Sequence, residues 1–199
     1  MTVRHDPTEL DAAAGVGPAA GVLVIGYGNP LRSDDGAGPV VAERLAADPR
    51  LLGAEIRAEH QLTPEVAIDA SRVALLVLVD ADERVPAGEV VVRELAAASG
   101  ASGTRAPTGR DGRGGPPLTH HVDPSSLLAL AAELWGAAPR TVVVGIGPQS
   151  LDLGDELTPV VAAAVPRAVD AVVAAIGAAR TADPAAAART GAPVAGTEG

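Results

Sequence analysis

Cysteine is absent from this chain of 199 residues, and aromatic side chains are nearly absent, with no phenylalanine, one tyrosine and one tryptophan. Without thiols, the chain forms no disulfide, holds no thiolate-bound metal and has no cysteine nucleophile. Its core must be mostly aliphatic, and hydrophobic residues make up 47% of the chain. A basic excess is also lacking: the formal net charge is −10, which disfavours phosphate backbones and predicts no nucleic-acid partner.

Three segments lack the apolar periodicity of a packed element. Residues 1–20 and 180–199 are predicted to be flexible tails and residues 99–117 a mobile loop, which leaves 21–179 as a single α/β domain. Residues 1–20 do not read as a signal peptide. Pro166 and nearby charges interrupt the most apolar stretch, 158–179, before it reaches the length of a membrane span. We therefore expect a cytoplasmic protein without membrane contact.

Strand-like and helix-like segments alternate within the predicted domain. Strands are expected over 22–25, 55–58, 73–79, 89–95 and 141–146, and helices over 39–47 and from residues 63, 123 and 158. This alternation predicts a three-layer α/β sandwich whose mostly parallel, twisted sheet has about five strands and helices on both faces. The link between 73–79 and 89–95 is too short for a helical crossover, which predicts an antiparallel hairpin and one antiparallel edge strand. Pro166 should kink the last helix.

Acidic residues follow two of the predicted strands. Asp34 and Asp35 come after a glycine-broken turn at the end of the first strand, and Asp80 ends the most apolar strand. Parallel strands present their carboxyl ends at one sheet edge, where ligands bind, so Asp35 and Asp80 are expected to lie near each other. The alternative for the Asp34–Asp35 pair is an acidic turn that favours a helix dipole. Asp82 is expected to be a solvated loop charge.

Histidine supplies the third candidate group. His120 and His121 are adjacent, and neighbours in an extended chain point in opposite directions, so one is expected to face inward. A surface histidine pair is the alternative. His60 follows the second predicted strand and is expected to be an ordinary loop histidine, with a place in the same cleft as the alternative. Two carboxylates and one imidazole with open positions suit a borderline divalent ion such as zinc, nickel or cobalt.

Nucleotide-binding and serine-hydrolase motifs are missing from the sequence. Gly26 and Gly28 begin a G-x-G pattern, but its third glycine falls on Leu31, and neither a Walker A motif nor a G-x-S-x-G elbow is present. These departures weigh against a dinucleotide, and no organic cofactor is expected.

The first acidic motif belongs to a longer pattern. The segment V-L-V-I-G-Y-G-N-P-L-R-S-D-D-G-A-G (22–38) resembles the N-terminal signature of the NiFe-hydrogenase maturation proteases. The resemblance continues in the same order through 75–82, 86–90, 119–128, 143–150 and 157–161, and so covers roughly 22–178.

This resemblance implies a metal-recognition site made of Asp35, Asp80 and His120, with His121 as the alternative to His120. It implies a metal-dependent endopeptidase that removes the C-terminal extension of a NiFe-hydrogenase large-subunit precursor after nickel insertion, with Asp35 or Asp80 as the catalytic base. The nickel is carried by the precursor, which is the implied partner, and we expect the chain to be a monomer. The alternatives are a catalytic metal of the protease's own and a non-catalytic nickel-centre checkpoint or chaperone.

Overall fold

The computed structural model describes residues 21–95 and 122–182. The predicted tail 1–20, the predicted loop 99–117, residues 183–199 and both His120 and His121 lie outside the described residues. Residues 180–182, which were predicted to begin the C-terminal tail, belong to the last helix.

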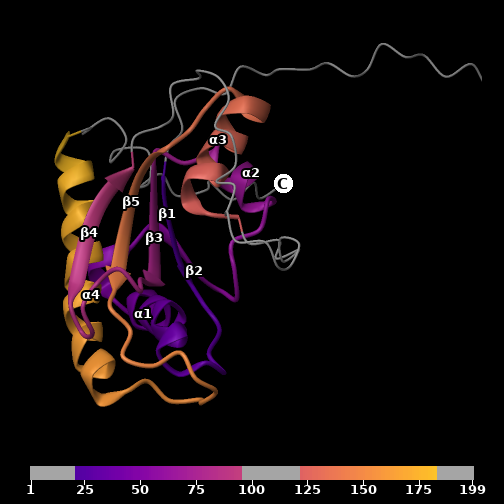
Figure 1. Cartoon of the computed structure of the whole chain (residues 1–199). Helices are drawn as coiled ribbons and strands as arrows, with labels where there is room; N and C mark the ends of the chain where they lie inside the picture. The colour runs from indigo at the N-terminus through magenta and orange to yellow at the C-terminus, as the bar shows by residue number, and fades with distance from the viewer. Residues whose placement is uncertain (1–20, 96–121, 183–199) are drawn as a thin grey trace, which may run out of the picture.

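One sheet of five strands forms the centre of the domain, in the order β2-β1-β3-β5-β4 (Figure 1). β1, β2, β3 and β5 are parallel, and β4 is an antiparallel edge strand paired with β5. The predicted fold class is therefore confirmed. The strands are β1 (Val22–Tyr27), β2 (Ala54–Glu59), β3 (Leu75–Ala81), β4 (Val90–Leu95) and β5 (Arg140–Ile146).

The predicted hairpin between β3 and β4 is wrong, because β5 lies between them. The short link from Asp82 to Glu89 passes over the carboxyl end of β5, where the Asp82 N–H donates to the Ile146 carbonyl and the Gly88 N–H donates to the Gly147 carbonyl. β5 is mostly buried and suits a central position, whereas β4 is partly exposed and suits an edge.

Helices cover both faces of the sheet (Figure 1). α1 and α4 pack on one face against an aliphatic cluster that includes Val77 and Val144, and α2 and α3 pack on the other against Leu76 and Leu78. The alternation of β3 side chains between the two clusters is the period-two pattern of a strand buried on both faces. The helices are α1 (Ala37–Ala46), α2 (Val66–Ala70), α3 (Pro124–Trp135) and α4 (Pro159–Ala182), with 3-10 turns η1 (Ser33–Gly36) and η2 (Pro49–Leu51).

Helices were predicted from residues 63 and 123, and the structure agrees with the second prediction but not with the first. The helix expected from residue 123 is α3, and Asp123 caps it, because its carboxylate accepts hydrogen bonds from the backbone N–H groups of Ser125 and Ser126. The helix expected from residue 63 begins instead at Val66, after a turn in which the Val66 N–H donates to the Thr63 carbonyl.

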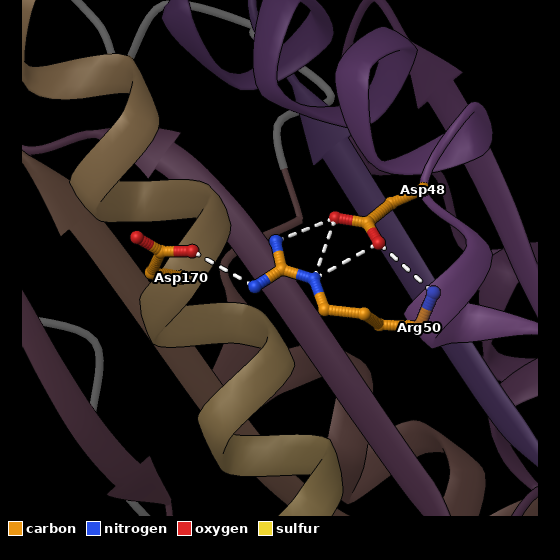
Figure 2. A network of polar contacts seen from close by, with 3 residues as sticks. All are labelled: Asp48, Arg50 and Asp170. Carbon is orange, nitrogen blue, oxygen red and sulfur yellow. Dashed lines mark hydrogen bonds and ion pairs between the residues drawn. The ribbon is translucent and has the colours of Figure 1, made fainter.

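α4 is 24 residues long, continues through Pro166, and is by length and composition apolar enough to cross a membrane. Its apolar side instead packs on the sheet, with Val165, Val172 and other small aliphatic residues in the core. A surface network also joins α4 to η2: Arg50 contacts Asp48 at 2.6 Å and Asp170 at 3.1 Å (Figure 2). Because Arg50 is half exposed, this network contributes little to stability.

Candidate functional site

A pocket of about 280 Å³ opens at the carboxyl end of the parallel strands. It is lined by residues from the ends of β1, β2 and β3 and from the start of α3. Asp35 and Asp80 both line it, so the structure brings together the two acids that the sequence placed at this edge. His60, which was expected to be an ordinary loop histidine, lines the pocket as well. Gly28, Gln61, Leu62, Val122 and Pro124 complete the lining, together with Tyr27 and Asp123.

Asp35 reaches the pocket because the chain turns tightly between β1 and η1. Gly28 has φ of 141°, and a Cβ atom there would collide with the Asp35 backbone carbonyl, so only glycine allows this approach. The Asp35 carboxylate accepts a hydrogen bond from the Asn29 backbone N–H at 3.0 Å. Its Oδ2 is fixed by this bond, which leaves the partly buried carboxylate directed at the pocket.

Asp80 lies near the end of β3, next to the end of β1. The pKa of its carboxyl is raised to about 6, mainly by burial and also by the negative charge of Asp35, although hydrogen bonds from the Tyr27 hydroxyl and the Ala81 backbone oppose the shift. An acid with a pKa near 6 takes up and releases a proton close to neutral pH. Asp80 therefore has the acid–base behaviour that a hydrolytic site requires.

Tyr27 and Asp123 are pocket residues that the sequence reading did not assign to the site. Burial raises the pKa of the Tyr27 hydroxyl, and the neighbouring Asp80 carboxylate raises it further, so this phenol stays a hydrogen-bond donor. Burial alone would raise the pKa of Asp123, but its hydrogen bonds at the start of α3 lower it overall. The signal for Tyr27 was its place at the end of β1 as the chain's only tyrosine.

Asp34 has a different role from its neighbour Asp35. It is fully buried and faces the β5–α4 loop, where its carboxylate accepts hydrogen bonds from the backbone N–H groups of Gln149 (2.8 Å), Ser150 (2.9 Å) and Thr158 (2.7 Å) and from the Thr158 hydroxyl (3.0 Å). Burial on its own would raise the pKa of Asp34, but these hydrogen bonds outweigh it and lower the pKa. Asp34 is therefore an ionised structural residue that anchors the loop.

Asp82 was expected to be a solvated loop charge, and this expectation is wrong. It is 8% exposed and forms ion pairs with Arg84, at 2.8 Å, and with Arg93 of β4. The pairing ties the end of β3 to the edge strand across Gly145 of β5. Asp82 does not line the pocket.

Within residues 21–95 and 122–182, no group of three or more His, Cys, Asp and Glu side chains is arranged to hold a metal ion. Asp35 and Asp80 provide two carboxylates at one pocket, and the predicted third group, His120 or His121, lies outside the described residues. Two oxygen donors leave most coordination positions of a divalent ion to another molecule.

Several solved structures share this fold. The crystal structure of hydrogenase 2 maturation peptidase from Thaumarchaeota archaeon SCGC_AB-539-E09 is 27% identical, covers 79% of this chain and 98% of its own, and has a TM-score of 0.56. The hydrogenase maturating endopeptidase HybD from E. coli is 21% identical, with coverages of 80% and 93% and a TM-score of 0.59. The hydrogenase maturation protease HycI from Thermococcus kodakarensis KOD1 is 22% identical, with coverages of 77% and 90% and a TM-score of 0.53.

No family model and no curated protein matches the chain. The shared structure nevertheless extends over nearly the whole of each of these three proteins. The chain has the fold of the hydrogenase maturation peptidases, and the resemblance inferred from the sequence is confirmed at the level of the fold.

Proposed function

We propose that this chain is a hydrogenase maturation endopeptidase, acting in the cytoplasm, that removes the C-terminal extension of a NiFe-hydrogenase large-subunit precursor after nickel insertion. The observation that carries the proposal is that Asp35 and Asp80, far apart in the sequence, line one pocket in a fold shared with hydrogenase maturation peptidases. The large-subunit precursor is the proposed partner, and nickel is part of that substrate.

The chemistry of the pocket supports nickel recognition by the two carboxylates, with His120 as the third group and His121 as its alternative. Carboxylate and imidazole ligands suit a borderline divalent ion. Since the chain has no cysteine, it offers no thiolate that would compete for the metal in the precursor. A site that only completes the coordination of a metal held by the substrate discriminates nickel-loaded from empty precursor.

The hydrolytic step needs a base for the attacking water. Asp80, whose pKa is about 6, accepts a proton from water as the water oxygen adds to the scissile carbonyl carbon. The carbon–nitrogen bond then breaks, and the proton passes to the leaving amine. The substrate's nickel supplies Lewis-acid polarisation at this site. Asp35, held by the Asn29 N–H, contributes the second carboxylate, and either acid is a candidate base.

A non-catalytic checkpoint that binds the nickel centre would use the same pocket. The two functions differ in one product, because only a peptidase shortens the precursor. Incubation of the purified chain with nickel-loaded and nickel-free precursor, followed by mass spectrometry, separates them. We expect loss of the C-terminal extension from the nickel-loaded form alone.

Site variants then test the residues. Asp35→Asn and Asp80→Asn should each abolish shortening of the nickel-loaded precursor while the circular dichroism spectrum stays that of the folded protein. The matched control is Asp170→Asn on α4, which changes the same group at a position 69% exposed and outside the pocket. Normal processing by both site variants would rule out the assigned site, and loss of processing in the control would show a non-specific effect.

A further inference from the structure

Two leucines are held out to solvent beside the pocket. Leu153 is 90% exposed and Leu31 is 65% exposed, and they lie on two segments that are bonded to each other. Large apolar side chains on a surface favour contact with another apolar surface. We call residues 29–33 and 150–156 together the docking loops.

The docking loops are rigidly joined rather than loosely adjacent. The Gly154 N–H donates to the Leu31 carbonyl at 3.1 Å, the Ser33 N–H donates to the Gly154 carbonyl at 2.8 Å, and the Arg32 guanidinium donates to the Leu151 carbonyl at 3.1 Å. Arg32 and Gly154 form a parallel β-bridge. The exposed leucines are therefore presented in a fixed arrangement at little entropic cost on binding.

Local strain and a buried charge both serve this arrangement. Ser33 has a φ of 45°, a left-handed conformation that is unfavourable for a residue with a side chain. The buried Asp34 carboxylate bonds the other segment through Gln149, Ser150 and Thr158. The structure thus uses a strained residue and a desolvated acid to hold loops whose leucines make no core contact, which is typical of a functional surface.

The position of the docking loops indicates which part of a binding partner they would contact. Residues 29–33 lie between Gly28 and Asp35, which both line the pocket, and backbone hydrogen bonds join them to Gly154, so the docking loops adjoin the pocket. η1 follows β1 and the β5–α4 loop follows β5, so both lie at the carboxyl end of the parallel strands. Figure 1 shows the loop at this end of the sheet. Leu52, which is 81% exposed, precedes β2 and so lies at the opposite end of the parallel strands.

The charge of the docking loops indicates what kind of partner surface would bind them. Within the docking loops, the exposed acids Asp152, Asp155 and Glu156 outnumber the single exposed base, Arg32. A partner surface that accepts the leucines would therefore have an apolar hollow with basic residues around it.

We infer that the docking loops are the surface on which the folded body of the precursor seats, with Leu31 and Leu153 in an apolar hollow rimmed by basic side chains. This inference rests on the proposed function, because it takes the precursor as the partner. It assigns binding of the protein substrate to a surface separate from the pocket that meets the metal.

The test compares Leu153→Asp with Leu52→Asp, which places the same charge on a similarly exposed leucine at the other end of the sheet. In the active protein, Leu153→Asp should raise the KM for nickel-loaded precursor roughly tenfold, as loss of an interface anchor does, and leave kcat unchanged. Leu52→Asp should change neither constant. Added salt should weaken binding, since the rim of the surface is charged.

A binding measurement separates this inference from the proposed function. The dissociation constant of the precursor is measured in the Asp80→Asn background, alone and with each leucine variant. Weaker binding with Leu153→Asp but not with Leu52→Asp supports the docking loops even if the wild type does not cleave. Equal binding by the two leucine variants, a change in kcat with no change in KM, or no binding of the precursor overturns the inference.

Discussion

Replacing a carboxylate by an amide should have opposite effects on stability at two aspartates of this fold. Asp80 is held in a pocket that disfavours its charge, whereas Asp34 is held by hydrogen bonds that favour its charge. We therefore expect Asp80→Asn to stabilise the domain at neutral pH and Asp34→Asn to destabilise it.

The magnitude for Asp80 follows from its pKa. The pKa of this carboxyl is 3.8 in the unfolded chain and about 6 in the folded protein, so its protonated form favours the folded state. Stability is lost as pH rises from 3.8 through about 6, to a total of about 3 kcal/mol at 1.36 kcal/mol per pH unit. An asparagine keeps an acceptor for the Tyr27 hydroxyl and never ionises, so the variant should exceed the wild type by up to about 3 kcal/mol at pH 8 and by little at pH 3.

The magnitude for Asp34 follows from its contacts. Its two oxygens accept from four donors, and an amide nitrogen in place of either oxygen would face a donor. Loss of a charge-assisted hydrogen bond and the desolvation of an unpaired group should cost about 3 kcal/mol at neutral pH. Because the folded pKa of Asp34 is lowered, this contribution is present above its unfolded pKa and fades as pH falls through its folded pKa.

The assay is urea unfolding from pH 3 to pH 8 in the presence of a chelator, followed by the fluorescence of Trp135, the only tryptophan. We expect the free energy of unfolding of Asp80→Asn to exceed that of the wild type by an amount that grows with pH. We expect that of Asp34→Asn to fall below the wild type by an amount that also grows with pH. An Asp80→Asn variant less stable than the wild type at pH 8, or a difference independent of pH, would refute the reasoning.

Further predictions concern the walls of the pocket. Tyr27→Phe removes a hydrogen bond that lowers the pKa of Asp80, so the acidic limb of the processing rate against pH should move to higher pH. Gly28→Ala places a Cβ against the Asp35 carbonyl at a positive φ, so thermal unfolding should occur at lower temperature and processing should fall. Asp123→Ala removes the cap of α3 and should lower the free energy of unfolding by about 1 kcal/mol in urea titrations, while Asp123→Asn should recover most of the loss.

The layered fold was predictable because its signals are local. The uninterrupted apolar run of β3 predicts a strand buried on both faces, and the apolar stripe of α4 predicts a helix packed on one side. The alternation of strands and helices along the chain then predicts the α/β fold class. The insertion of β5 between β3 and β4 was not predictable, because it depends on a pairing between distant segments that competes with a local hairpin.

The candidate site was predictable to a similar extent. Asp35 and Asp80 meet because parallel strands end at one edge, and this follows from topology alone. The division of roles between Asp34 and Asp35 was not readable, since it depends on the β5–α4 loop that supplies the donors to Asp34. The contact of Tyr27 with Asp80 likewise required β1 to lie beside β3.

The most direct test of the account is the mass of a large-subunit precursor before and after incubation with the wild type, the Asp35→Asn variant and the Asp80→Asn variant. We predict that the wild type releases one C-terminal fragment from precursor that carries nickel and none from precursor that lacks it, and that neither variant releases any. Release of the same fragment from both forms of the precursor, or by both variants, would contradict the claim that this carboxylate pocket recognises the metal and cleaves beside it.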